Sequence, residues 1–283
     1  MKVCATVHGA VSIVNAIATR KGATLGIGLE VNVTAESIPG RGISIHSENK
    51  SLSSRLIKNT VEMIVPRRTL ESCKIRLVLD SEIPTGYGLK SSSAISSAVA
   101  LACAKIFHPK LTDRQIILAG VRASISSKVS ITGAYDDACS CYYGGFNVTD
   151  NAEKKRHIHE RAPSGLCAVI FVPRNRKRGN LKKLKNLSAV FENAWKSAIS
   201  SKYWEAMTIN GLATATILNS DPMLVAKLLE AGAYGASVSG NGPAIAAITK
   251  KNNESAIKKI FDGLEGRVIV SRINNKEASV REV

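Results

Sequence analysis

A glycine- and serine-rich segment between an expected strand and an expected helix constrains this chain most. It reads Pro-Thr-Gly-Tyr-Gly-Leu-Lys-Ser-Ser-Ser-Ala over residues 84–94. Glycine permits positive φ and a close approach of the backbone to a ligand, and the free N–H groups that begin the next helix attract anions. With the cation of Lys90, the segment predicts a phosphate-binding loop, although its spacing is not that of G-x-x-x-x-G-K-[ST]. The alternative is a glycine turn followed by a serine helix cap.

Hydrophobic periodicity predicts both strands and helices around this loop. Alternating apolar residues predict strands at 25–33 and 75–79, and a helix closed by Pro66 is expected between them at 54–65. Apolar residues at i, i+3, i+4, i+7, i+8 and i+11 within 95–106 predict an amphipathic helix. The first half of the chain therefore mixes the two kinds of element.

The second half continues this mixture. Its expected elements are a strand at 166–172, helices at 188–200, 203–218, 222–231 and 254–263, and strands at 234–239, 243–249 and 267–273. The helix at 222–231 is framed by Asp221 as N-cap, Pro222 as first residue and Gly232 just beyond its end. Neither half alternates regularly enough for a doubly wound parallel sheet, so we predict an α+β protein with domains 1–155 and 156–283.

Composition sets broad limits on the class of protein. The chain has 283 residues, of which 45% are hydrophobic and 22% charged, as in ordinary globular proteins rather than disordered ones. No apolar run reaches the roughly 18 residues of a membrane span, and the N-terminus lacks the pattern of a signal peptide. We therefore expect a cytoplasmic protein without a membrane partner.

The charge is strongly positive. Lys and Arg number 39 against 22 Asp and Glu, a formal net charge of +17, with clusters at 154–156, 174–178 and 182–185. Such an excess attracts nucleic acid, acidic membrane surfaces or small phosphorylated and carboxylated metabolites. Residues 174–185 contain no aromatic side chain, so the stacking that is common in single-strand binding is not indicated. The plain alternative is a solvated basic surface.

Cysteine and histidine indicate no metal site. The six cysteines are scattered without metal-ligand spacing, and we expect reduced thiols, with Cys103 packed in a helix core. His157 and His159 form no zinc signature and are expected on a surface loop.

Two further segments hold candidate chemistry. Residues 132–139, Thr-Gly-Ala-Tyr-Asp-Asp-Ala-Cys, place Asp136 beside Asp137 ahead of a Gly-Gly pair at 144–145. Adjacent carboxylates in a small, apolar setting can hold a metal or accept a hydroxyl proton, but they also cap helices. Residues 232–243 are glycine-rich between expected strands and by themselves indicate a tight hairpin.

Together these three segments resemble the GHMP kinases, the family of galactokinase, homoserine kinase and mevalonate kinase. The resemblance rests on P-x-G-x-G-L-x-S-S-x-A, on a G-x-x-D-type segment seven residues before Gly-Gly, and on the late S-G-x-G-P loop. It covers most of the chain in motif order. It implies a ribosomal-protein-like N-terminal βα domain and a ferredoxin-like C-terminal domain, with ATP and the acceptor between them. The implied reaction is transfer of the γ-phosphoryl group to a small molecule, with Mg²⁺.

Within this family the chain resembles the archaeal-type shikimate kinases. The similar segments are G-L-K-S-S-S, T-G-A-Y-D-D-A, V-S-G-N-G-P and, near the N-terminus, R-K-G-A-T-L-G-I. This similarity implies ATP-dependent phosphorylation of the shikimate 3-hydroxyl, a step of aromatic amino-acid biosynthesis. The alternatives are another acceptor, such as homoserine or a mevalonate-type acid, a family member without catalysis, and a basic RNA-binding protein, which no RNA-recognition motif supports.

The resemblance also implies roles for individual residues. Asp137 occupies the position of the catalytic aspartate, and Lys90 is the second catalytic candidate. ATP is expected on Gly86, Tyr87, Gly88, Leu89, Lys90, Ser91, Ser92, Ser93, Ala94, Ile95 and Ser96. Ser92 is the expected magnesium ligand. The acceptor is expected on Asp137, Lys21, Ser239 and Gly240.

Two positions depart from the family pattern. Many relatives have a lysine in the first loop, where this chain has Gly-Ala-Val at 9–11, and Lys21 and Lys90 are the candidates to replace it. Relatives often carry a glutamate metal ligand where this chain has Ser126, and Asp136 is the candidate to compensate. The sequence predicts no oligomeric state.

Overall fold

Two long antiparallel strands, β1 (Lys2–Val14) and β2 (Lys21–Pro39), form the centre of the first sheet. The computed structural model describes residues 1–49, 51–130, 132–176 and 179–283. The sheet has the order β11-β1-β2-β4-β3, with β5 on β2 and β6 on β5. The added strands are β3 (Gly42–Ser47), β4 (Cys73–Ser81), β5 (Phe146–Asp150), β6 (Lys155–Glu160) and β11 (Ser279–Glu282).

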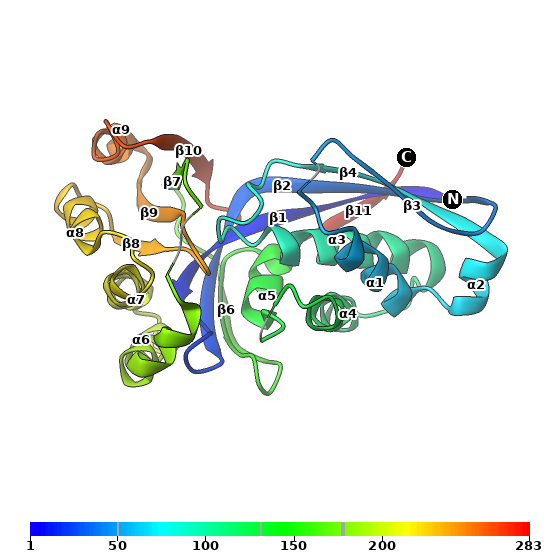
Figure 1. Cartoon of the computed structure of the whole chain (residues 1–283), viewed down its shortest axis with the longest axis horizontal. Coiled ribbons are helices and arrows are strands. Elements are labelled where there is room, and N and C mark those ends of the chain that lie inside the picture. The colour runs from blue at the N-terminus through cyan, green and yellow to red at the C-terminus, as the bar shows by residue number, and fades with distance from the viewer. Residues whose placement is uncertain (50, 131, 177–178) are drawn as a thin grey trace.

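The strand β2 changes partner along its length. Its residues 31–39 pair with β4, whereas its residues 21–25 pair with β5. The sheet therefore divides beside β2, and the end of β1 and the start of β2 extend toward the second half of the molecule (Figure 1).

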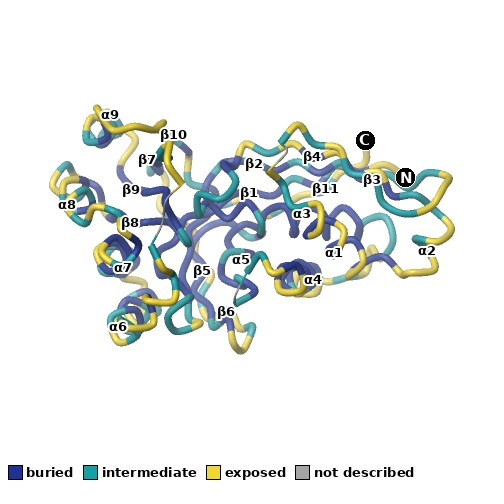
Figure 2. Tube along the Cα trace, in the orientation of Figure 1, coloured by how far each residue is buried: buried dark blue, intermediate teal, exposed yellow. Residues whose placement is uncertain are grey.

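Helices cover one side of this sheet. They are α1 (Ser54–Ile64), α3 (Ser91–Phe107), α4 (Asp113–Ser126) and α5 (Tyr135–Tyr143), with the short α2 (Arg67–Ser72) at the far end (Figure 1). The core follows β1, β2 and α3 (Figure 2). The helix α3 is rich in alanine and serine and is buried almost all round, which allows close packing between the sheet and α1, α4 and α5. This packing fixes the position of the N-terminus of α3.

The second sheet is antiparallel and has the order β10-β7-β9-β8. Its strands are β7 (Leu166–Pro173), β8 (Gly235–Val238), β9 (Ile245–Lys250) and β10 (Gly266–Arg272). The helices of this half are α6 (Ser188–Ile199), α7 (Tyr203–Ile217), α8 (Pro222–Glu230) and α9 (Glu254–Lys259), with 3-10 turns η1 (Leu181–Leu187) and η2 (Lys251–Asn253). Phe191 is fully buried, and Phe171 stacks on Phe261 at 5.1 Å in the core between sheet and helices.

A buried polar contact joins the two halves. Asn210 of α7 is fully buried, and its side chain accepts a hydrogen bond from the Asn15 backbone at 2.8 Å. The same amide donates to Ser237 Oγ in β8 at 2.7 Å. Asn210 therefore fixes the end of β1 against the second sheet.

The α+β class and two-part architecture are confirmed, and most predicted elements are present. Asp221 caps α8, and its side chain accepts from the Met223 backbone at 2.9 Å. The predicted helix at 254–263 is too long, because α9 ends at Lys259. His157 and His159 are exposed, as predicted, but they lie in the strand β6 and not in a loop.

The path of the chain between the sheets is more complex than a single crossing. The chain leaves the first sheet between β6 and β7, and β11 returns to pair with β1. The domain division after residue 155 remains a prediction.

All six cysteines are free, and Cys103 is fully buried. Within the described ranges, no helix combines the length and hydropathy needed to cross a bilayer. Two residues of the basic cluster 174–178, at 177 and 178, lie outside the described residues.

We expect Asn210→Ala to lower the free energy of unfolding by about 1–3 kcal/mol, because the Asn15 N–H loses its buried acceptor. Urea denaturation of both proteins measures this change. The exposed Asn252→Ala is the control and should shift stability by less than about 0.5 kcal/mol. Equal effects of the two substitutions would contradict a structural role for Asn210.

Candidate functional site

A cavity of about 470 Å³ lies where the glycine- and serine-rich segment, the start of α5 and the late glycine-rich loop meet. Its walls come from both halves of the molecule. The polar and glycine residues that line it include Ser12, Asn15, Gly86, Gly88, Lys90, Ser91, Ser92, Ser93, Ser124, Lys128, Asp136, Asp137, Gly240 and Asn241.

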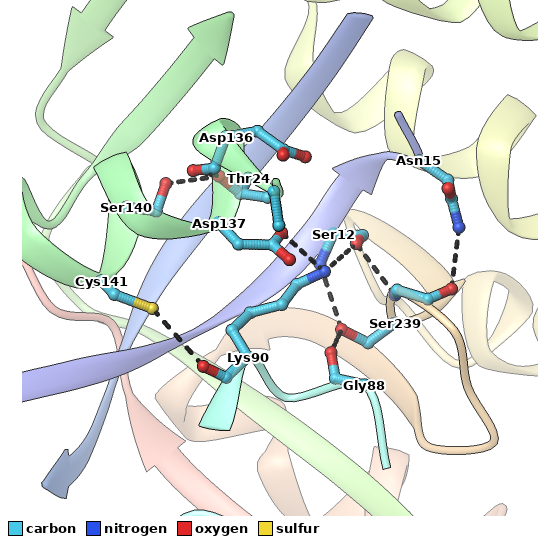
Figure 3. Close-up of polar contacts among 12 residues, drawn as sticks. Ser12, Asn15, Thr24, Gly88, Lys90, Asp136, Asp137, Ser140, Cys141 and Ser239 are labelled. Carbon is cyan, nitrogen blue, oxygen red and sulfur yellow. Dashed lines mark hydrogen bonds and ion pairs between the residues drawn. The ribbon is translucent and has the colours of Figure 1, made fainter. Parts of the chain in front are cut away.

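Lys90 occupies the centre of this arrangement. It is the N-cap residue of α3 in the left-handed conformation, with φ 68° and ψ 24°. Its buried ammonium lies 2.9 Å from Asp137 Oδ1 and donates to Ser12 Oγ at 2.7 Å (Figure 3). A left-handed lysine is strained, and these two contacts hold the side chain in place.

The start of α3 is open to an anion. No side chain caps the helix among the described residues, so the N–H groups of its first turn, at Ser91, Ser92 and Ser93, remain available. These residues line the cavity. Together with the helix dipole they form a site for phosphate.

The two adjacent carboxylates of α5 have different surroundings. Asp137 faces Lys90, whereas Asp136 is buried and accepts from Asn151 Nδ2 at 2.6 Å. The Asn151 side chain in turn accepts from the Asp136 backbone at 3.0 Å, and Thr24 Oγ1 donates to the Asp136 carbonyl at 2.8 Å. These bonds fix the first turn of α5, and Figure 3 shows Thr24 beside Asp136.

The environment of Asp136 changes its titration. Burial and the nearby charge of Asp137 raise its pKa to about 7, against the opposing effects of Lys90 and of the Asn151 hydrogen bond. The raised pKa favours the protonated form of this carboxyl group, and a cation in the cavity would favour the ionised form instead.

The late glycine-rich loop is hydrogen bonded to the first half. Ser239 Oγ donates to the Gly88 carbonyl at 2.8 Å and accepts from the Ser12 backbone at 3.2 Å. The Gly240 N–H donates to Ser12 Oγ at 2.9 Å, and Asn15 Nδ2 donates to the Gly240 carbonyl at 2.8 Å. A Cβ on Gly88, whose φ is +85°, would lie 1.8 Å from the Ser239 carbonyl oxygen, so this contact requires glycine.

The structure brings together most of the residues expected to bind ATP or the acceptor. Those that line the cavity are Gly86, Gly88, Lys90, Ser91, Ser92, Ser93, Asp137 and Gly240. Leu89, Ala94 and Ile95 are buried in the core, and Ser96 Oγ donates to the Ser93 carbonyl at 3.2 Å. Ser239 supports the loop through the bonds described above.

Tyr87 faces a neighbouring hollow. Its ring lies 4.9 Å from the Arg176 guanidinium, and Asn49 and Thr85 line the same hollow. The glycine- and serine-rich segment thus separates two recesses.

Lys21 is placed away from the cavity lining. Its ammonium lies 2.7 Å from Glu192 Oε1 and 4.7 Å from the centre of the Trp195 ring. Of the two lysines considered for the missing first-loop lysine, only Lys90 lies beside Asp137 within the described residues.

Ser126 does not line the cavity either. Its hydroxyl donates to the Ala123 carbonyl at 3.0 Å and accepts from Asn59 Nδ2 at 3.1 Å. Ser124, two residues earlier in α4, lines it instead.

Several residues of the site were not predicted. Ser12 and Asn15 lie at the end of β1, and Asn151 follows β5. The only local signal is a polar residue that ends an apolar strand run, which is common in proteins without a site. Lys128 and Ser124 line the cavity from the end of α4, which the periodicity did not predict as a helix.

Oxygen donors in the cavity suit Mg²⁺. The Ser92 hydroxyl and the carboxyl groups of Asp136 and Asp137 line the same space. In the described part of the chain, no group of three or more His, Cys, Asp or Glu side chains is arranged to hold a metal. Mg²⁺ commonly binds through one or two carboxylates, water and substrate phosphates. The donors therefore fit a magnesium ion that binds together with a nucleotide.

Known proteins share this organisation. Residues 55–145 match the family described as GHMP kinases N terminal domain, and residues 222–266 match GHMP kinases C terminal. A shikimate kinase of Methanosarcina acetivorans is 36% identical, with 97% of this chain and 95% of the relative covered. A shikimate kinase of Methanothermobacter thermautotrophicus is 33% identical, with 97% and 96% covered. A solved homoserine kinase from Cytophaga hutchinsonii has a TM-score of 0.76 and 20% identity, and 99% of this chain and 97% of that chain are covered.

We expect the stability of the ligand-free protein to fall as the pH rises from about 4 to about 7, because the folded state favours protonated Asp136. A group whose pKa is higher in the folded state contributes stability that is fully present below its unfolded-state pKa. This stability is lost as the pH rises through the folded-state pKa. Asp136→Asn should flatten this decline in urea denaturation measured across the range. The exposed Asp80→Asn is the control. Parallel pH profiles for wild type and Asp136→Asn would contradict the assignment.

Proposed function

The chain belongs to the GHMP kinase family, and within that family we propose that it is a shikimate kinase that transfers the γ-phosphoryl group of ATP to the shikimate 3-hydroxyl. The observation that carries the transfer is the buried ion pair between Lys90 and Asp137 beside the uncapped start of α3. The acceptor is supported by the shikimate kinases that match almost the full length of the chain.

The phosphates of ATP would bind at the start of α3. Gly86 and Gly88 have φ of +84° and +85°, and because glycine has no side chain the backbone is open to a ligand at this end of the cavity. The N–H groups of Ser91, Ser92 and Ser93 would bind the phosphate oxygens. The hollow beside Tyr87 lies on the same segment and would hold the adenine base.

Mg²⁺ would be held by Ser92 together with Asp136 or Asp137. When bound, it would neutralise charge on the phosphates and on the transferring group. The site also holds a protein cation, the Lys90 ammonium, directly against Asp137.

Asp137 would hold the acceptor hydroxyl in line with the γ-phosphate and accept its proton. The transition state of phosphoryl transfer is loose, so positioning and charge stabilisation matter more than the strength of the base. Lys90 would fix the orientation of the Asp137 carboxylate and add positive charge beside the transferred group. Ser12 would in turn fix Lys90.

The charge and the thiols agree with this proposal. A net charge of +17 attracts both ATP and a carboxylate acceptor. We also propose a cytoplasmic location, which the free state of the six cysteines supports.

A coupled ADP-release assay with ATP and Mg²⁺ tests the proposed function. Shikimate, homoserine and mevalonate are supplied in parallel, and we expect acceptor-dependent turnover with shikimate alone. Turnover with homoserine or mevalonate instead would overturn the proposed acceptor but leave the nucleotide site intact. Measurable ATP binding with no turnover on any acceptor would contradict a shikimate kinase.

We expect Asp137→Asn to lower kcat with shikimate by roughly 10²- to 10⁴-fold, the usual contribution of a positioned acid or base. Binding of a non-hydrolysable ATP analogue should change much less than kcat, because the N–H groups at the start of α3 are still present. Asp80→Asn, on the exposed face of β4, is the control and should retain wild-type kcat. A near-normal kcat for Asp137→Asn would remove Asp137 from the reaction.

A further inference from the structure

A second cavity, of about 520 Å³, lies between α5 and the start of β6 and shares no lining residue with the first. It is formed by Arg114 at the start of α4, by Tyr135 and Tyr143 at the two ends of α5, and by residues 153–156. We propose that this α5–β6 cavity binds a small anion that carries a carboxylate or phosphate group.

The charge of the lining is the first argument. Arg114, Lys154, Lys155 and Arg156 supply four cations, against one acid, Glu153, which is exposed. Over the described ranges of the chain, none of these four cations lies within 4.0 Å of a carboxylate. A recess lined by charges of one sign concentrates the field and attracts the opposite charge.

Arg156 is already positioned for an anion. Its guanidinium carbon lies 3.9 Å from the centre of the Tyr143 ring, and this stacking fixes the plane of its N–H groups. Its Nη1 is buried and has no hydrogen-bond partner among the described residues. A buried donor without an acceptor is unfavourable, and an anion in the cavity would provide the missing acceptor.

Lys154 keeps its positive charge unneutralised. Its ammonium donates to the backbone carbonyls of Thr132, at 3.3 Å, and of Asn151. Carbonyl groups orient an ammonium but do not cancel its charge. Burial lowers the pKa of Lys154, as expected for a cation that lacks a carboxylate partner.

The tyrosines add donors rather than negative charge. Burial raises the pKa of Tyr135 and raises that of Tyr143 to about 12, so both hydroxyl groups stay protonated at neutral pH. The cavity therefore presents guanidinium, ammonium and phenol donors, which is the donor set that a carboxylate or phosphate requires.

Titration calorimetry with inorganic phosphate and with benzoate, at constant ionic strength, tests this proposal on the full chain. The two probes distinguish a phosphate ligand from a carboxylate ligand. Arg114→Gln removes a cation from the α5–β6 cavity, and Arg122→Gln removes an exposed cation from the same helix outside it. Both variants change the net charge equally.

We expect Arg114→Gln to weaken one class of binding for at least one probe by about tenfold, and Arg122→Gln to change it less than about twofold. Lys90→Gln alters the first cavity and should leave anion binding in the α5–β6 cavity unchanged, which separates the two classes of binding. If Arg114→Gln unfolds, Arg156→Lys provides the second test. Lysine keeps the positive charge but lacks the planar guanidinium that stacks on Tyr143.

Two results would overturn the proposal. One is an equal loss of anion affinity in Arg114→Gln and Arg122→Gln, which would indicate only a general attraction of anions to the positive charge. The other is a single class of binding that Lys90→Gln removes. Neither result depends on kinase turnover, so the proposed function and this proposal fail independently.

Discussion

The ion pair between Lys90 and Asp137 determines how the rest of the site is arranged. It connects the start of α3 to the start of α5, and through Ser12 it also connects both helices to β1. A buried charge that loses its partner is strongly unfavourable, so the two groups must stay together. As a consequence, the N–H groups that can bind phosphate and the carboxylate that can hold a hydroxyl have fixed relative positions.

The neighbouring carboxylates show how one helical turn can provide two different acids. Asp137 faces a cation, whereas the buried Asp136 accepts a hydrogen bond from the Asn151 amide. The pKa of Asp136 is raised, chiefly by burial. Adjacent residues on a helix point about 100° apart, and this difference in direction is sufficient to separate their roles.

Local signals made part of this site predictable. Gly88, Lys90 and Asp137 lie in short motifs, and the caps of α8 use neighbouring residues whose chemistry is evident from the sequence. The contacts of Ser12, Asn15 and Asn210 were not predictable, because their partners are far away in the sequence and depend on how the two sheets meet. The charge of Lys21 suggested a role at the site, and in the structure its ammonium lies beside Glu192 instead of lining the cavity. The edge strands β6 and β11 were missed because they are mostly exposed and lack a buried apolar face.

The bonds between the late glycine-rich loop and the first half have a consequence for ligand exchange. Ser239 is bonded to Gly88, and Gly240 is bonded to Ser12 and Asn15. A hinge motion that moved the two sheets apart would break all of these partly buried bonds at once. These bonds therefore oppose separation of the two sheets, and any such opening during nucleotide exchange would have to break them together.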